Sequence, residues 1–125
     1  MTEFTRTVSP VTSAPMVGIS RTEPRYDVPP PFSPGDAWPE YRRFGAPPAQ
    51  TRNLVYRAVR DAFRSLGLDV EHEGTEAWNP LGTVIEPGDS VLLKPNFVRE
   101  FRESSADHAD CLITHGAILR AVLDY

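Results

Sequence analysis

The sequence predicts an α/β domain with a partial parallel sheet, in the order strand, helix, strand, helix. Two short apolar runs, residues 16–20 and 91–94, have strand character, and each is followed later by a segment with one apolar face at helical spacing. Strands that alternate with helices are typical of a parallel sheet covered by helices. Because sheets usually have about four to six strands, and no strand follows the second helix, we expect an incomplete domain.

The first part of the chain divides into a tail and a strand. Residues 1–15 are rich in Thr, Ser and Pro, so we expect a flexible tail there and the start of the α/β domain in residues 16–125. The run MVGIS at 16–20 contains Val and Ile and predicts a strand, although Gly18 weakens this prediction.

A long proline-rich loop separates this strand from the first helix. Proline lacks an N–H group and fixes φ, so neither a helix nor a central strand is expected here. A flexible linker has no need of many rings, so we expect an ordered loop that packs over the domain. Its functional alternatives are a substrate lid or a polyproline segment that docks a partner. Segment 26–44 contains five aromatic residues, Tyr26, Phe32, Trp38, Tyr41 and Phe44.

Residues 51–67 have the clearest helical pattern. Thr51 can cap the start, and Gly67 can close the end in a left-handed conformation. The apolar face recurs at helical spacing and consists of Leu54, Val55, Ala58, Val59, Ala62, Phe63 and Leu66. Three arginines off this face are interpreted as solvent-facing, and only weakly as a binding patch: Arg57, Arg60 and Arg64.

The second predicted strand ends on Lys94-Pro95-Asn96. Its apolar run does not alternate with polar residues, which favours a strand covered on both faces. Pro95 cannot donate to a sheet, and it biases Lys94 towards an extended conformation. Ligands of parallel sheets collect beyond the carboxyl ends of the strands. We therefore expect Lys94 and Asn96 at such an edge.

A second helix is expected over 114–125, with Thr114 as its cap and Ile113 and Ile118 as a hydrophobic staple. Its apolar face is expected to be Ile118, Leu119, Val122 and Leu123. The helix start offers free N–H groups and the positive end of the helix dipole. We therefore predict a phosphate or carboxylate site that consists of Arg21, Lys94, Asn96, Thr114 and His115.

These residues also have simpler interpretations. Lys94 can extend its stem over apolar surface at a strand end, and Asn96 can cap a turn. The sequence has no glycine-lysine phosphate loop. A metal site at His108, Cys111 and His115 is a weaker hypothesis, because zinc accepts these ligands but the spacing fits no standard site. Cys111 is more simply a small buried apolar residue.

Composition excludes some classes of function. The net charge of -4 and the pI of about 5.3 argue against a nucleic-acid binder, which usually has a basic surplus. No apolar run reaches the ~20 residues that span a membrane, and the N-terminus lacks the features of a signal peptide. The single cysteine, Cys111, cannot form an internal disulfide, so a cytoplasmic location is expected.

Two motifs resemble the N-terminal part of the family called domain of unknown function 362. They are WNPLGTVIEPGDSVLLKPNFV and THGAILRAVLDY, and a weaker likeness lies in VGISR and WPEY. The resemblance covers residues 78–125 and places four polar residues at motif positions, Lys94, Asn96, Thr114 and His115. It implies a protein that is usually much longer and often bacterial, with a largely undefined biochemical activity.

Some members of that family have iron–sulfur cysteines further along the chain, and some occur with cell-surface polysaccharide genes. One cysteine cannot supply the four thiolates of a cluster, so the cofactor stays unknown and no cluster is expected within this chain. We expect this chain to contribute part of an anionic-ligand site, while further C-terminal sequence or a partner completes the sheet. The alternatives are an interaction module that uses 26–44, and a truncated product without activity of its own.

Overall fold

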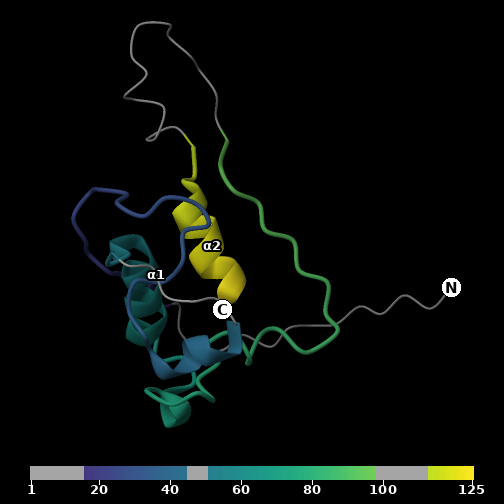
Figure 1. Ribbon diagram of the computed structural model, residues 1–125. Coiled ribbons are helices and arrows are strands. Elements are labelled where there is room, and N and C mark those ends of the chain that lie inside the picture. The colour runs from purple at the N-terminus through teal and green to yellow at the C-terminus, as the bar shows by residue number, and fades with distance from the viewer. Residues whose placement is uncertain (1–15, 45–50, 98–112) are drawn as a thin grey trace, which may run out of the picture.

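The computed structural model describes residues 16–44, 51–97 and 113–125. Within these ranges the chain forms the α-helices α1 (Leu54–Ser65) and α2 (Gly116–Asp124). Two short 3₁₀ helices, η1 (Pro39–Phe44) and η2 (Val70–His72), flank α1 in the sequence. The two α-helices pack against each other, and the other described segments run around them as extended chain and turns (Figure 1).

The predicted α/β fold with a parallel sheet is wrong for the part of the chain that the structure describes. This part has no strand, and its one isolated bridge joins Phe97 and Ile113 in antiparallel orientation. The apolar run 91–94 lies along one side of the molecule (Figure 1), where Val91 is 56% and Leu92 is 90% exposed. A continuous apolar run indicates a segment that gains from burial, but it does not identify the segment that covers it.

The other predicted strand, residues 16–20, contacts α1. The hydroxyl of Ser20 donates a hydrogen bond to the carbonyl oxygen of Ala58 at 2.6 Å. A Cβ atom at Gly18 would lie 2.5 Å from the carbonyl oxygen of Ala62, so this close approach requires glycine. Gly18 therefore serves the packing of the segment on a helix, and not a strand pair.

The buried side chain of Asn53 caps α1, so the prediction of Thr51 as the cap was wrong. Oδ1 of Asn53 accepts the N–H of Tyr56 at 3.1 Å, and Nδ2 donates to the carbonyl oxygens of Phe32 and Ser33, each at 3.0 Å. One residue thus caps the helix and holds the proline-rich loop against it. At the other end, Gly67 has a φ of 66°, which confirms the predicted left-handed helix end.

α2 packs through a different face from the predicted one. Ala117 and Ala121 are buried, whereas Leu123, a member of the predicted apolar face, is 68% exposed. The small alanine side chains let α2 approach the rings around α1 closely. The cap of α2 is His115, whose Nδ1 accepts the N–H of Ala117 at 3.2 Å, so the prediction of Thr114 as the cap was wrong.

The core is aromatic and includes part of the proline-rich loop. The ring of Tyr41 makes T-shaped contacts with Trp38 and Tyr56, with centroids 5.1 Å and 4.9 Å apart. Ala121 of α2 belongs to the same buried cluster, and Tyr125 packs against it. Because Trp38 and Tyr41 come from the loop, this part of the loop is ordered by its rings, as predicted.

Arg60 is buried, so its interpretation as solvent-facing was wrong. Its Nε donates to Oε1 of Glu40 at 2.5 Å, and the two residues are 5% and 0% exposed. The guanidinium lies between the rings of Trp38 and Trp78, at 4.9 Å and 4.8 Å from their centroids. Burial lowers the pKa of Arg60, but the hydrogen bond and the charge of Glu40 raise it by more. The pKa is therefore above its ordinary value, and Arg60 stays charged.

Candidate functional site

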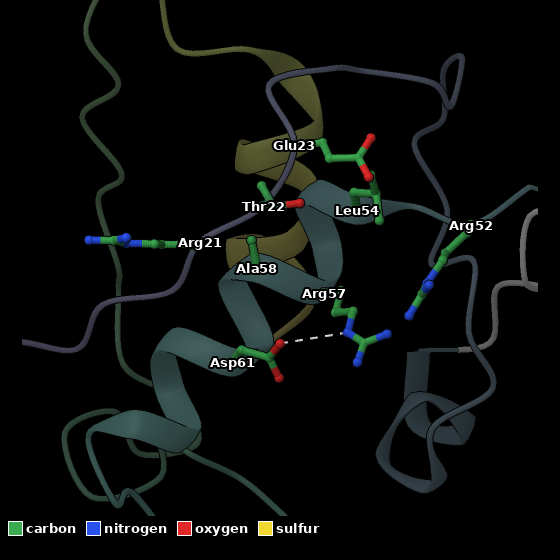
Figure 2. A pocket seen from close by; sticks show the side chains of 8 residues that line it. All are labelled: Arg21, Thr22, Glu23, Arg52, Leu54, Arg57, Ala58 and Asp61. Carbon is green, nitrogen blue, oxygen red and sulfur yellow. Dashed lines mark ion pairs between the residues drawn. The ribbon is translucent and has the colours of Figure 1, made fainter.

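An open pocket of about 550 Å³ lies between segment 21–23 and the N-terminal half of α1 (Figure 2). Three of its lining residues are arginines and two are acidic, so the lining has a formal charge of +1. We call it the arginine pocket, and its lining consists of Arg21, Thr22, Glu23, Arg52, Leu54, Arg57, Ala58 and Asp61.

The arginines of this pocket have donors to spare. Nε of Arg57 lies 3.7 Å from Oδ2 of Asp61, and Nε of Arg52 lies 4.0 Å from Oδ2 of Asp36. Both distances exceed hydrogen-bond range. In Figure 2 the side chains of Arg52 and Arg57 extend to the same side of α1, whereas Arg21 extends the opposite way. A guanidinium can form two parallel hydrogen bonds to a phosphate or carboxylate.

The backbone around Arg52 is fixed by the proline-rich loop. A Cβ at Gly35 would lie 2.3 Å from the backbone nitrogen of Asn53 and 2.6 Å from Cα of Arg52. The loop therefore rests directly on the chain that leads into α1. Arg57 projects from the second turn of the same helix, close to its positive end. Loop packing and helix geometry together place these two cations beside one pocket.

The acidic residues of the pocket moderate its charge. Asp61 is shared, because its Oδ2 lies 3.7 Å from Arg57 and its Oδ1 lies 3.6 Å from NH1 of Arg64. Glu23 is paired with Arg25, since its Oε2 lies 3.3 Å from Nε of Arg25. Each carboxylate thus faces an arginine outside the pocket lining, which leaves the pocket more positive than the formal count suggests.

The predicted site residues do not gather at one sheet edge, because the described chain has no sheet. Arg21 lines the arginine pocket. Asn96 and Thr114 do lie together: the N–H of Thr114 donates to the carbonyl oxygen of Asn96 at 2.8 Å, and the N–H of Asn96 donates to Oγ1 of Thr114 at 3.0 Å. Lys94 is exposed two residues before Asn96, and His115 follows Thr114 as the cap of α2.

Two rings of the proline-rich loop contact His115. Tyr26 stacks on the imidazole with centroids 3.8 Å apart, and Phe32 makes an edge contact at 5.3 Å. A Cβ at Gly116 would lie 2.6 Å from the ring of Phe32, so glycine permits this contact. Nδ1 of His115 accepts from Ala117, so in the neutral ring the other nitrogen carries the hydrogen. The contacts of His115 are those of a helix cap.

Of the residues predicted to form a metal site, the structure describes only His115. His108 and Cys111 lie outside the described residues. In the ranges that the structure describes, no three His, Cys, Asp or Glu side chains are grouped so that they could hold a metal ion. Arg52 was not predicted from the sequence, and Arg57 was predicted only weakly as part of a binding patch. Their spacing of five residues does not indicate a shared pocket, because the pocket depends on where the loop lies.

No protein-family model, curated protein or solved structure matches this chain. Neither α-helix in the described ranges has the length and apolar character that a membrane span requires. The resemblance to domain of unknown function 362 therefore stays a prediction.

Proposed function

We propose that this chain binds a small anionic ligand, a phosphate or a carboxylate, in the arginine pocket. The observation that carries the proposal is the pair Arg52 and Arg57, whose guanidinium groups extend to one side of α1. Among the described residues, neither has a carboxylate within hydrogen-bond range. Charge-assisted hydrogen bonds of this type contribute about 1.5–3 kcal/mol each. Arg21, selected from the sequence for the same kind of ligand, forms another edge of the pocket.

The proposed role is binding rather than a reaction. Glu23 and Asp61 lie in the same lining and repel an anion, so they limit its affinity. The pocket is also open to water, which screens its charges. For inorganic phosphate we therefore expect a dissociation constant on the order of 1 mM, which corresponds to about 4 kcal/mol of binding free energy.

A second position for an anion is proposed at Lys94, Asn96, Thr114 and His115. The hydrogen bonds between Asn96 and Thr114 support it, since they hold two distant segments together beside the start of α2. We also propose that the chain belongs to the family called domain of unknown function 362 and that it is cytoplasmic. Docking of a partner by 26–44 is not favoured, because Tyr41 of this segment is only 6% exposed.

Calorimetric titration with inorganic phosphate at constant ionic strength tests the proposal. We expect the variant Arg52→Ala/Arg57→Ala to bind phosphate at least about tenfold more weakly, from the loss of at least one charge-assisted bond. The matched control is Arg42→Ala. Arg42 is an exposed arginine of η1, which pairs with Glu76 at 2.6 Å outside the pocket, and its loss should leave the affinity unchanged.

The titration also separates the two positions. If Lys94→Ala weakens phosphate binding and the double arginine variant does not, the anion binds near the start of α2 and the arginine pocket is excluded. Unchanged affinity in both variants would contradict anion binding at either position.

A further inference from the structure

A second pocket adjoins the arginine pocket. It has a volume of about 270 Å³ and shares three lining residues with its neighbour, Thr22, Glu23 and Ala58. Segment 20–26 forms one side of it, α1 forms another, and Ile118 of α2 contributes to the lining. The two pockets are therefore neighbours along α1.

The second pocket is mainly apolar, and we call it the apolar pocket. Its wall consists of consecutive turns of α1, with Val55, Val59 and Ala62, and of Ile118 from α2. Arg25 also lines it, but this arginine pairs with Asp27 at 2.7 Å and with Glu23 at 3.3 Å. Since the charge of Arg25 is engaged by its own neighbours, the pocket favours an apolar group.

Segment 20–26 is fixed at both ends and spans the apolar pocket. At one end, the Ser20 hydroxyl donates to the carbonyl oxygen of Ala58 on α1. At the other end, the ring of Tyr26 stacks on His115 at the start of α2. Figure 1 shows this part of the chain passing from α1 towards α2. The segment is thus held at both ends, and it forms one wall of the pocket.

We propose that the ligand is amphipathic, with a phosphate or carboxylate head held by Arg52 and Arg57 and an aliphatic chain in the apolar pocket. This inference rests on the proposed function and names the ligand class of the same site. A volume of 270 Å³ equals about nine water molecules at ≈ 30 Å³ each. Each CH₂ group moved from water into such a pocket contributes about 0.8 kcal/mol. A short alkyl chain therefore adds affinity that the open arginine pocket alone does not provide.

The test compares octyl phosphate with inorganic phosphate by calorimetry on the full chain, below the concentration at which octyl phosphate forms micelles. We expect octyl phosphate to bind at least about tenfold more tightly, which requires burial of only two CH₂ groups. The variant Ala62→Leu fills the apolar pocket, so it should remove this advantage and leave the affinity for inorganic phosphate unchanged. On the unmodified chain, methyl resonances of Val59 and Ile118 should shift with octyl phosphate and not with phosphate.

The outcomes distinguish this inference from the proposed function. Equal affinities for the two ligands, both reduced by Arg52→Ala/Arg57→Ala, would overturn the inference and keep anion binding. Tighter binding of octyl phosphate without methyl shifts at Val59 and Ile118 would mean that the octyl group binds outside the apolar pocket. This result would also overturn the inference. If neither ligand depends on the two arginines, the proposed function fails as well.

Discussion

Arg57 and Arg60 lie three residues apart on α1, yet they belong to two contrasting faces of the helix. Arg60 is 5% exposed, bonded to Glu40 and enclosed by two tryptophan rings. The side chain of Arg57 is 44% exposed, and its ion pair with Asp61 is long, at 3.7 Å between Nε and Oδ2. The same residue type thus serves stability on the inner face and is free for a ligand on the outer face. Burial and the nearest carboxylate decide between the two roles.

Three tyrosines with raised pKa values gather at the inner face of α1, and one of them, Tyr56, lies on the helix itself. Burial is the main cause that raises the pKa of Tyr41, Tyr56 and Tyr125 above the usual value for tyrosine. The hydroxyl of Tyr56 donates to Oδ2 of Asp124 at 2.6 Å, which favours the neutral phenol further. Ionisation of this face therefore opposes folding, whereas the outer face already contacts water.

The largest expected effect is a loss of stability at alkaline pH. A raised folded-state pKa means that each tyrosine contributes stability fully below its unfolded value of 10.0. That contribution falls as the pH rises above this value, by up to about 1.4 kcal/mol per pH unit for each of the three tyrosines. Urea unfolding at pH values below and above 10.0, with tyrosinate absorbance recorded in parallel, measures this loss of stability. A free energy of unfolding that stays constant above pH 10.0 would contradict the account of the inner face.

The next largest effect is expected from Arg60→Met. It leaves the carboxylate of Glu40 buried without its cation, which costs about 3–5 kcal/mol of unfolding free energy. The double variant Arg60→Met/Glu40→Leu removes both charges and should recover much of this loss. Urea unfolding of both variants measures the effect. A loss below about 1 kcal/mol in the single variant would mean that the inner face does not depend on the pair.

A smaller effect is expected from Gly35→Ala, which tests the link between the loop and the outer face. The new Cβ would meet backbone atoms of residues 51–53, and such overpacking costs about 1–3 kcal/mol. Because Arg52 moves with this backbone, phosphate binding should weaken too. The control Gly74→Ala has open space around its Cβ but a φ of 80°, so it should strain the backbone without changing phosphate affinity. Unchanged affinity in Gly35→Ala would separate the loop from the pocket.

The smallest effect on stability is expected from Arg57→Met. Its ion pair with Asp61 is long and exposed to water, so the free energy of unfolding should change by no more than about 0.5 kcal/mol. Phosphate affinity should nevertheless fall. A stability loss comparable to that of Arg60→Met, measured by the same urea unfolding, would show that the two faces do not differ.

The helices of this fold could be predicted from sequence because their signals are local. The apolar spacing on α1 and the left-handed turn at Gly67 depend on residues within one helix. The parallel sheet was predicted wrongly because the apolar run 91–94 indicates burial without specifying its partner. The aromatic core could not be placed, since it combines loop residues such as Tyr41 with residues of both helices.

The candidate site depends even more on contacts between distant residues. Helical spacing shows that Arg57 and Arg60 lie off the apolar face, but their roles depend on Glu40, which lies twenty residues before Arg60 in the sequence. Arg52 gains its position from the contact with Gly35 in the loop. Of the residues that line the arginine pocket, Arg21 was predicted in an anion site, but at a sheet edge that the described chain does not have, and Arg57 was predicted only weakly in a binding patch.

The most direct test of the contrast between the two faces is one NMR titration that follows the arginine Nε–H resonances as inorganic phosphate is added. The account predicts that the resonances of Arg52 and Arg57 shift and saturate together, while that of Arg60, which is held by Glu40, stays in place. A shift of Arg60 without shifts of Arg52 and Arg57 would contradict the division of α1 into a stabilising face and a ligand-binding face.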